Sequence, residues 1–173
     1  MNDLVLLAGL LHGPAYGYAL KKTAGLIFGA SALHNNIVYP SLRKFVQNGW
    51  VQVSSVPGER GQQRKQYRIT AAGRKYLIEQ LKTFGEREAA DHGAFLLRVA
   101  FFDVLPKTKC LEIMAARKAS LTARAARLAA LRESTAAQSY AATVLYRLLA
   151  QGASELEWVG DLERKYRADK GGN

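Results

Sequence analysis

The chain has 173 residues, the length of one compact domain or of two small ones that share a core. It carries 25 Lys and Arg residues against 14 Asp and Glu residues, a formal net charge of +11. Hydrophobic residues make up 49% of the chain and charged residues 23%, which excludes a disordered protein, while the length excludes a large multidomain enzyme. The positive excess favours an anionic partner, with nucleic acid as the leading candidate.

Cysteine content and the length of the apolar runs predict the cellular compartment of the protein. Cys110 is the one cysteine, so no internal disulfide forms and a reducing compartment fits. The longest apolar run, Leu4 to Leu11, is shorter than the ~18–20 residues that span a bilayer, and Met1-Asn2-Asp3 lacks the basic start of a signal peptide. We therefore expect a cytoplasmic, nucleoid-associated protein.

The basic residues concentrate in two stretches of the chain. Residues 21–75 hold ten Lys or Arg and one acid, Glu59, so most of the net charge falls in under a third of the chain. Residues 107–132 hold seven Lys or Arg and one acid, Glu112. An uneven distribution is typical of a surface that binds a polyanion, although the second stretch also fits a helix face that is simply solvated.

Apolar spacing and helix-ending residues predict three helices in the first 49 residues. Residues 4–11 form a short apolar helix, ended by Gly13-Pro14. Asn35 and Asn36 are good N-cap residues for a third helix that ends at residues 48–49. Between them a helix over about residues 15–28 has one apolar face, made by Tyr16, Leu20, Ala24 and Ile27.

The period then changes from that of a helix to that of a strand. Residues 50–54 and 64–69 alternate between apolar and polar side chains, and the turn-forming residues 57–61 separate them. This pattern predicts a two-stranded hairpin with a long, basic tip. Thr70 caps a fourth helix, in which Gly73 allows close packing and the buried stripe is Leu77, Leu81 and Phe84.

Three further helices are predicted beyond about residue 91. The first, residues 94–104, is apolar on nearly all sides and should be buried. The second, residues 106–134, has alternating spacings of three and four, as in a coiled-coil seam, and the third covers about residues 138–167. Residues 169–173 are expected to be a disordered tail. The apolar seams of these two long helices can bind a second copy of the chain, and the dimer interface predicted in that case consists of Leu111, Met114, Leu121, Leu128, Leu145, Leu148, Leu156 and Val159.

Three helices followed by a basic hairpin is the order of a winged helix-turn-helix. Val38, Leu42 and Phe45 of the third helix can face the core, which turns its polar and cationic side chains toward a DNA major groove. The flexible donors of the hairpin tip can reach phosphates or the minor groove. The predicted DNA contacts are Tyr18, Lys21, Asn35, Asn36, Tyr39, Ser41, Arg43, Lys44, Arg60, Gln63, Arg64 and Lys65.

The predicted fold is therefore mainly α with a small β-hairpin, in two domains. Residues 1–90 form the winged helix-turn-helix DNA-binding domain. Residues 91–168 form an antiparallel helical region whose apolar seam can serve dimerisation.

Three segments carry a resemblance to a known family. Residues 7–20 contain Leu-Leu, Gly-Pro and Gly-Tyr pairs, residues 38–42 read Val-Tyr-Pro-Ser-Leu, and residues 64–73 read Arg-Lys-Gln-Tyr-Arg-Ile-Thr-Ala-Ala-Gly. In this order and spacing they resemble the PadR family of transcriptional regulators, and the second half resembles the long C-terminal helical region of its larger members. The resemblance implies a homodimer, usually a repressor, on a pseudo-palindromic operator. Asn36 and Ile37 depart from the family's frequent Gly-Thr, so the operator sequence does not follow.

For residues 91–168 the resemblance also implies the binding of a small-molecule effector, commonly a phenolic acid or a planar drug. Arg98, Arg117 and Arg147 are candidates to pair with a ligand carboxylate, or with acidic residues of the chain itself. The candidate aromatic pocket consists of Phe101, Phe102, Tyr140, Tyr146 and Trp158. The alternative is that these rings belong to the core or to the dimer interface.

The sequence predicts no enzyme, no cofactor and no metal site. His12, His34 and His92 show no metal-ligand spacing, and no nucleophile elbow, paired carboxylates or phosphate-binding loop occurs. Cys110 fits a small buried side chain, with redox sensing as the alternative. A winged-helix module that binds RNA or protein without operator specificity is the alternative to a DNA-binding regulator.

Overall fold

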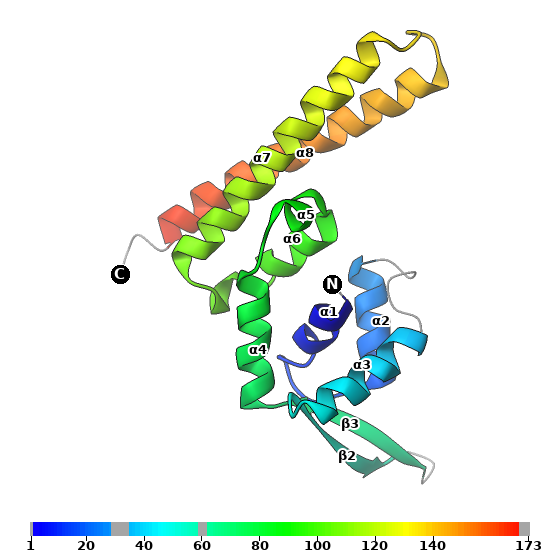
Figure 1. Cartoon of the computed structure of the whole chain (residues 1–173), viewed down its shortest axis with the longest axis vertical. Coiled ribbons are helices and arrows are strands. Elements are labelled where there is room, and N and C mark those ends of the chain that lie inside the picture. Colours follow the sequence, from blue (N-terminus) through cyan, green and yellow to red (C-terminus); the bar gives the residue numbers. More distant parts are fainter. Residues whose placement is uncertain (1, 29–34, 59–61, 170–173) are drawn as a thin grey trace. The chain divides into compact units, whose positions relative to one another are not determined.

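A computed structural model describes residues 2–28, 35–58 and 62–169 of the chain (Figure 1). The described chain is mainly helical, with a three-stranded antiparallel sheet in the order β1-β3-β2. It divides into two compact units, Met1–Thr83 and Phe84–Asn173. The predicted fold class, mainly α with a small β element, is confirmed. No helix in the described ranges is both long and apolar enough to cross a membrane.

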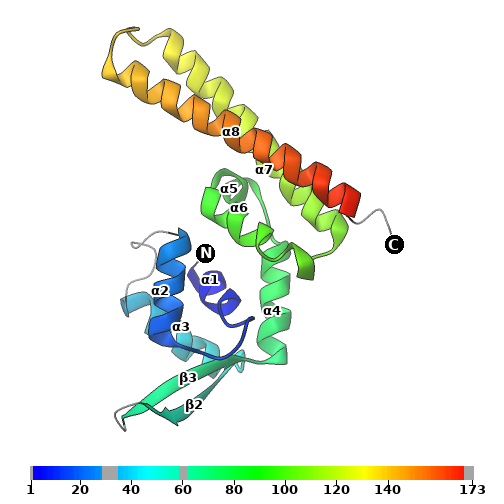
Figure 2. The ribbon, with the colours of Figure 1, turned by 180° about the vertical axis from the view of Figure 1, so that it is seen from behind.

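The first unit has the element order of a winged helix (Figures 1 and 2). β2 pairs with β3 along the whole hairpin, from Val51 opposite Ile69 to Pro57 opposite Gln63. This hairpin is the wing that the alternating pattern predicts. The elements of the unit are α1 (Asn2–Ala8), β1 (Ala15–Tyr16), α2 (Gly17–Phe28), α3 (Asn35–Gln47), β2 (Val51–Pro57), β3 (Gln63–Ile69) and α4 (Ala71–Lys82).

The apolar face of α3 holds that helix in the core of the first unit. Val38, Leu42 and Phe45 are completely buried, at the spacing of one helix face, as predicted. Fully burying one such side chain contributes about 1.5–3 kcal/mol, so this face fixes which side of α3 points outward. Side chains of α1 and α4 complete the core, among them Leu6, Leu7, Leu77 and Leu81.

The junction of wing and α4 is a tightly packed turn. The Thr70 hydroxyl accepts a hydrogen bond from the Gly73 N–H at 3.0 Å, which confirms Thr70 as the N-cap, and it donates to the Gly49 carbonyl at 2.7 Å. A Cβ added at Gly73 would lie 2.1 Å from the Trp50 carbonyl oxygen. The Trp50 ring stacks on Tyr76 at 3.7 Å between centroids. Backbone and rings together therefore tie the base of the wing to α4.

The structure corrects the start of the second predicted helix. Ala15 and Tyr16 form strand β1, which pairs with β3 through Ala15 opposite Tyr67, and α2 begins only at Gly17. Gly13 has a φ of +141°, so the chain turns there and then extends along the open edge of β3. Tyr16 is consequently exposed. The rest of the predicted face holds where it is described, since Leu20 and Ala24 are buried, while the side chain of Ile27 lies outside the described residues.

The second unit is built on a long helical hairpin of α7 and α8 (Figure 2). The predicted helix over residues 94–104 is wrong in its second half, because α6 ends at Val99 and a separate 3-10 turn follows. A short helix, α5, was not predicted, and it packs on α6 and α7, so residues 84–90 belong with the second unit. The elements are α5 (Glu86–Ala90), α6 (His92–Val99), η2 (Phe102–Val104), α7 (Lys107–Glu133) and α8 (Tyr140–Asp169).

The apolar seam of α7 packs against α8 of the same chain. Met114, Leu121, Leu145 and Val159 are all less than 10% exposed within one chain. These four residues form the core of the hairpin, so they are not a surface that a second copy can contact, and this part of the predicted dimer interface is wrong. The other four, Leu111, Leu128, Leu148 and Leu156, are half-buried. Cys110 is fully buried, as the simpler interpretation of that residue predicts.

Candidate nucleic-acid interface

The outer face of α3 presents the polar side chains expected of a recognition helix. Because the inner face is fixed by Val38, Leu42 and Phe45, Asn36, Tyr39 and Arg43 lie exposed on the opposite side. Amide, hydroxyl and guanidinium groups are those that read base edges and bind phosphates. Asn35 begins the helix, but its side chain lies outside the described residues.

The wing presents a second set of donors. Gln63, Arg64 and Lys65 are exposed on β3, opposite Pro57, Val56 and Ser55 of β2. Arg60, the predicted contact nearest the tip of the hairpin, lies outside the described residues. The described cations of the wing are therefore held on a paired strand rather than on an irregular loop.

One groove brings these two surfaces together. It has a volume of about 810 Å³ and lies between the first turn of α2, the outer face of α3 and strand β3. Its cations are Arg43, Arg64 and Lys65, and no acidic residue lines it. In the part of the chain that the structure describes, none of these three has a carboxylate partner. The full lining is Tyr16, Gly17, Tyr18, Ala19, Tyr39, Arg43, Gln63, Arg64, Lys65 and Tyr67.

Two tyrosines of this groove, Tyr16 and Tyr67, are not among the predicted DNA contacts. Tyr16 reaches the groove because β1 adds to the sheet, and Tyr67 because its place in β3 turns it inward. Burial raises the pKa of the Tyr67 phenol, more than the nearby Arg43 lowers it, so the hydroxyl stays protonated and can donate a hydrogen bond. The alternation of β3 was the available signal for Tyr67, whereas a two-residue strand has no pattern of its own.

Gly17 sets the distance between α2 and α3 at the groove. A Cβ at this position would lie 3.0 Å from Tyr39 Cε1 and 3.3 Å from Leu42 Cδ1. The absence of a side chain therefore lets the start of α2 approach the ring of Tyr39. Tyr18, the next residue, is 70% exposed at the rim. Lys21, one turn further along α2, is half-buried and does not line the groove.

Two predicted DNA contacts are held by an acid of α1 instead. The Ser41 hydroxyl is buried and donates to Asp3 Oδ1 at 2.7 Å, and Lys44 Nζ donates to Asp3 Oδ2 at 2.9 Å. Burial alone would raise the pKa of Asp3, but the hydrogen bonds from Lys44 and Ser41 hold it below its ordinary value. The prediction that Ser41 contacts DNA is wrong, because its hydroxyl points into this cluster, while Lys44 remains partly exposed.

The predicted aromatic pocket of the second unit is not assembled. Phe101 and Phe102 are buried beside η2, where Phe102 packs edge-on to Tyr166. Tyr140 is 92% exposed at the start of α8, and Trp158 lies 18 residues further along it, or about 27 Å at the rise of an α-helix. Residues this far apart do not line one pocket, so this grouping is wrong. Arg98 is buried in the same unit, with its guanidinium 5.3 Å from the centroid of the Phe84 ring.

The first unit combines a buried apolar scaffold with an exposed polar helix face and a cationic wing, and the last two share one groove. These features define a winged-helix protein that binds DNA. A sequence model of the Transcriptional regulator PadR-like family matches residues 6–79, from α1 into α4. The chain belongs to this family of transcriptional regulators, as the resemblance predicted. Among curated proteins, no sequence matches the chain.

Several solved structures are similar to the chain. A protein described as a transcriptional regulator of Thermoplasma acidophilum is 32% identical, over 46% of this chain and 75% of that one, with a TM-score of 0.43. PadR of Bacillus subtilis, in complex with operator DNA, is 17% identical over 95% of this chain and 98% of its own, with a TM-score of 0.44. A PadR-like regulator of Bacillus cereus is 18% identical over 98% and 100%, with a TM-score of 0.42.

Proposed function

We propose that the chain is a repressor that binds a pseudo-palindromic operator as a homodimer, in the cytoplasm. The observation that carries the proposal is the groove in which the exposed face of α3 meets the wing, with three cations that have no acidic neighbour in its lining. Asn36 and Tyr39 are assigned to base edges, and Arg43, Arg64 and Lys65 to phosphates. Tyr18 and Lys21 contribute from α2.

A second copy of the chain binds the second half-site of the operator. A two-fold dimer reads half-sites about 34–36 Å apart, or a multiple of that distance. The turn end of the α7–α8 hairpin supports this proposal, because its side chains Leu131, Tyr140 and Val144 are all more than half exposed. Exposed apolar side chains that gather on one surface favour a protein contact. This end therefore replaces the buried seam as the proposed dimer surface.

The proposed function includes release of the regulator from DNA by a small aromatic effector. The residues that would bind this effector are not assigned. The five predicted aromatic residues do not form one site, so no aromatic pocket is assigned to the second unit. The competing function, a winged-helix module for RNA or protein, shares the fold and differs in operator specificity.

Binding of the full chain to duplex DNA separates these functions. Two duplexes of equal length are titrated with the protein at ~0.15 M salt and followed by fluorescence anisotropy. One duplex comes from the DNA upstream of the gene that encodes the chain, and the other has a random sequence. A specific regulator binds the first more tightly by a factor of about 10³ or more. Equal affinity for the two duplexes, or a preference for single-stranded RNA, contradicts the proposal. Light scattering in the same buffer measures the mass, and a monomer contradicts the dimer.

A further inference from the structure

The basic stretch over residues 107–132 is only partly explained by the helical hairpin. Four of its cations have partners within the second unit: Lys109 with Glu112, Arg117 with Glu155, Lys118 with Glu163 and Arg132 over the Tyr146 ring. Arg124 and Arg127 are exposed and have no carboxylate or aromatic partner among the described residues. These two arginines differ in where they lie on α7.

Arg124 lines a groove between α7 and α8, and Arg127 does not. The groove has a volume of about 560 Å³ and receives a second arginine, Arg147, from α8. Arg147 is exposed and likewise has no carboxylate partner in the described ranges. Ala150 and Gly152 also line the groove, where one contributes a methyl group and the other no side chain.

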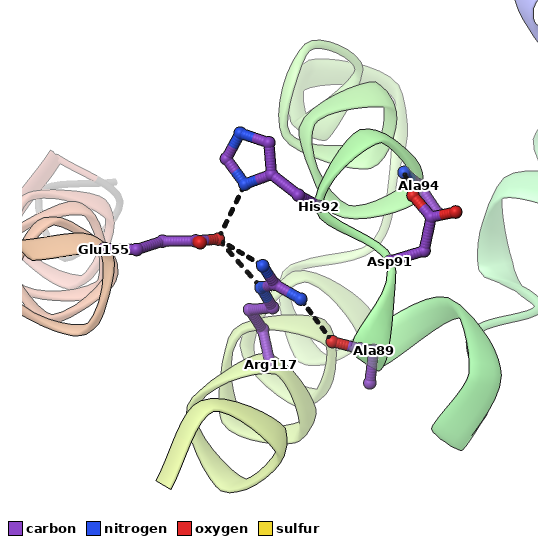
Figure 3. A network of polar contacts seen from close by, with 6 residues as sticks. All are labelled: Ala89, Asp91, His92, Ala94, Arg117 and Glu155. Atoms are coloured by element: carbon purple, nitrogen blue, oxygen red, sulfur yellow. Dashed lines mark hydrogen bonds and ion pairs between the residues drawn. The ribbon is translucent and has the colours of Figure 1, made fainter. Parts of the chain in front are cut away.

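Three residues of the groove lining, His92, Arg117 and Glu155, form a polar network (Figure 3). Arg117 is buried, and its Nη1 donates to the Ala89 carbonyl at 2.6 Å, while its Nε and Nη2 lie 2.8 Å and 2.6 Å from Glu155 Oε1. His92 Nδ1 lies 3.0 Å from the same oxygen. The one acid of the groove is therefore already paired with Arg117, and it leaves the charges of Arg124 and Arg147 uncompensated.

We propose that this groove binds a small oxyanion with more than one negative charge, a phosphate ester or a di- or tricarboxylate, between Arg124 and Arg147. Two like charges that line one groove repel each other, and a multivalent anion between them removes that repulsion. A guanidinium pairs with carboxylate or phosphate through two parallel hydrogen bonds. Gln151 and Ser154 lie one and two turns beyond Arg147 on the same face of α8 and supply further polar groups.

Calorimetric titration of the full chain with inorganic pyrophosphate and with citrate tests this site, with acetate at equal ionic strength as the ligand control. Arg124→Gln and Arg147→Gln remove the two ligands, and Arg127→Gln makes the same charge change outside the groove. We expect one site per chain for pyrophosphate, citrate or both, and about tenfold weaker binding in each groove variant. Arg127→Gln should bind as the wild type does. Because all three side chains are exposed, circular dichroism should show an unchanged fold.

The two ligands also identify the chemistry. Binding of pyrophosphate alone assigns a phosphate group to the site, and binding of citrate alone assigns carboxylates. The proposal is overturned if neither binds at millimolar concentration, or if Arg127→Gln weakens binding as much as the groove variants do. It is also overturned if the groove variants lose only affinity for duplex DNA, since the arginines then serve DNA. The titrations with pyrophosphate and citrate do not depend on whether the first unit recognises an operator.

Discussion

Lys44 Nζ lies 2.9 Å from Asp3 Oδ2, so an acid of α1 holds a cation of the candidate recognition helix. The same carboxylate accepts the buried Ser41 hydroxyl at 2.7 Å through its other oxygen. Ser41 and Lys44 lie three residues apart on α3 and so share one face. Asp3 therefore fixes the rotation of α3 about its own axis, in addition to the apolar face beneath it.

Replacing Asp3 should destabilise the first unit through Ser41. In Asp3→Ala the buried Ser41 hydroxyl loses its acceptor, which should lower the free energy of unfolding by about 1–3 kcal/mol. Urea denaturation followed by Trp50 fluorescence, in a Trp158→Phe background, measures this change. The double variant with Ser41→Ala should recover part of it, because both partners are then absent. Glu79→Ala, which breaks the exposed ion pair to Lys82, is the matched control and should change little.

The same contact should make stability depend on pH in the acid range. The pKa of Asp3 lies below its ordinary value of 3.8 in the folded chain, because the hydrogen bonds from Lys44 and Ser41 outweigh its burial. Its contribution is therefore complete above pH ~4 and is lost as the pH falls through the folded pKa. The stability difference between wild type and Asp3→Ala should be constant from pH 5 to 7 and shrink below about pH 3.8. A difference that grows on acidification would contradict this sign.

The wing cations should act on all DNA sequences alike. Arg64→Ala with Lys65→Ala should weaken binding to specific and random duplexes together and reduce the slope of log affinity against log salt by about 1.8, or ~0.9 for each phosphate contact. Anisotropy titrations between 50 and 200 mM salt measure the slope. Arg74→Ala with Lys75→Ala removes the same charge from exposed positions on α4 outside the groove. Equal losses in both double variants would assign the effect to net charge rather than to the groove.

The outer face of α3 should decide which sequence is preferred. Asn36→Ala and Tyr39→Phe each remove a hydrogen-bonding group without changing charge, so the ranking of duplexes should change more than the mean affinity. Each lost base contact should reduce discrimination at its position by about 1–3 kcal/mol. Selection from a randomised duplex library measures the ranking. Tyr76→Phe, on a ring stacked against Trp50 outside the groove, should leave the ranking intact, and an unchanged ranking in all three variants would refute the assignment.

Two glycines should respond to alanine with opposite signs. Gly73→Ala places a Cβ 2.1 Å from the Trp50 carbonyl oxygen, which already accepts the Thr70 N–H at 2.9 Å, so the turn must shift at a cost of about 3 kcal/mol. A Cβ added at Gly152 in α8 meets nothing within 4 Å, so Gly152→Ala should raise the free energy of unfolding by up to about 1 kcal/mol through its higher helix propensity. Thermal melts of the two variants measure both shifts. A tolerated Gly73→Ala would show that the packing of the wing on α4 is loose.

The sequence by itself determined the elements whose signals are local. The spacing of Val38, Leu42 and Phe45 defines the buried face of α3, and through it the exposed positions of Asn36 and Tyr39. The change to a period of two predicts the wing, and Thr70 with Gly73 predicts the start of α4. Each of these signals works within one helix turn or one strand pair, so no knowledge of the rest of the chain was needed.

Tertiary structure decided what covers each surface. An apolar seam on α7 has the same spacing whether it packs on a second chain or on α8 of its own chain, and the structure shows the second arrangement at Met114 and Leu121. The polar residues of α3 likewise have the same spacing whether they contact DNA or, as Ser41 does, an acid of the same chain. The partner of Ser41 is Asp3, 38 residues away in the sequence. Periodicity determines which side chains share a face. Only the folded chain brings distant segments together, and so only the fold shows which faces stay open to a partner.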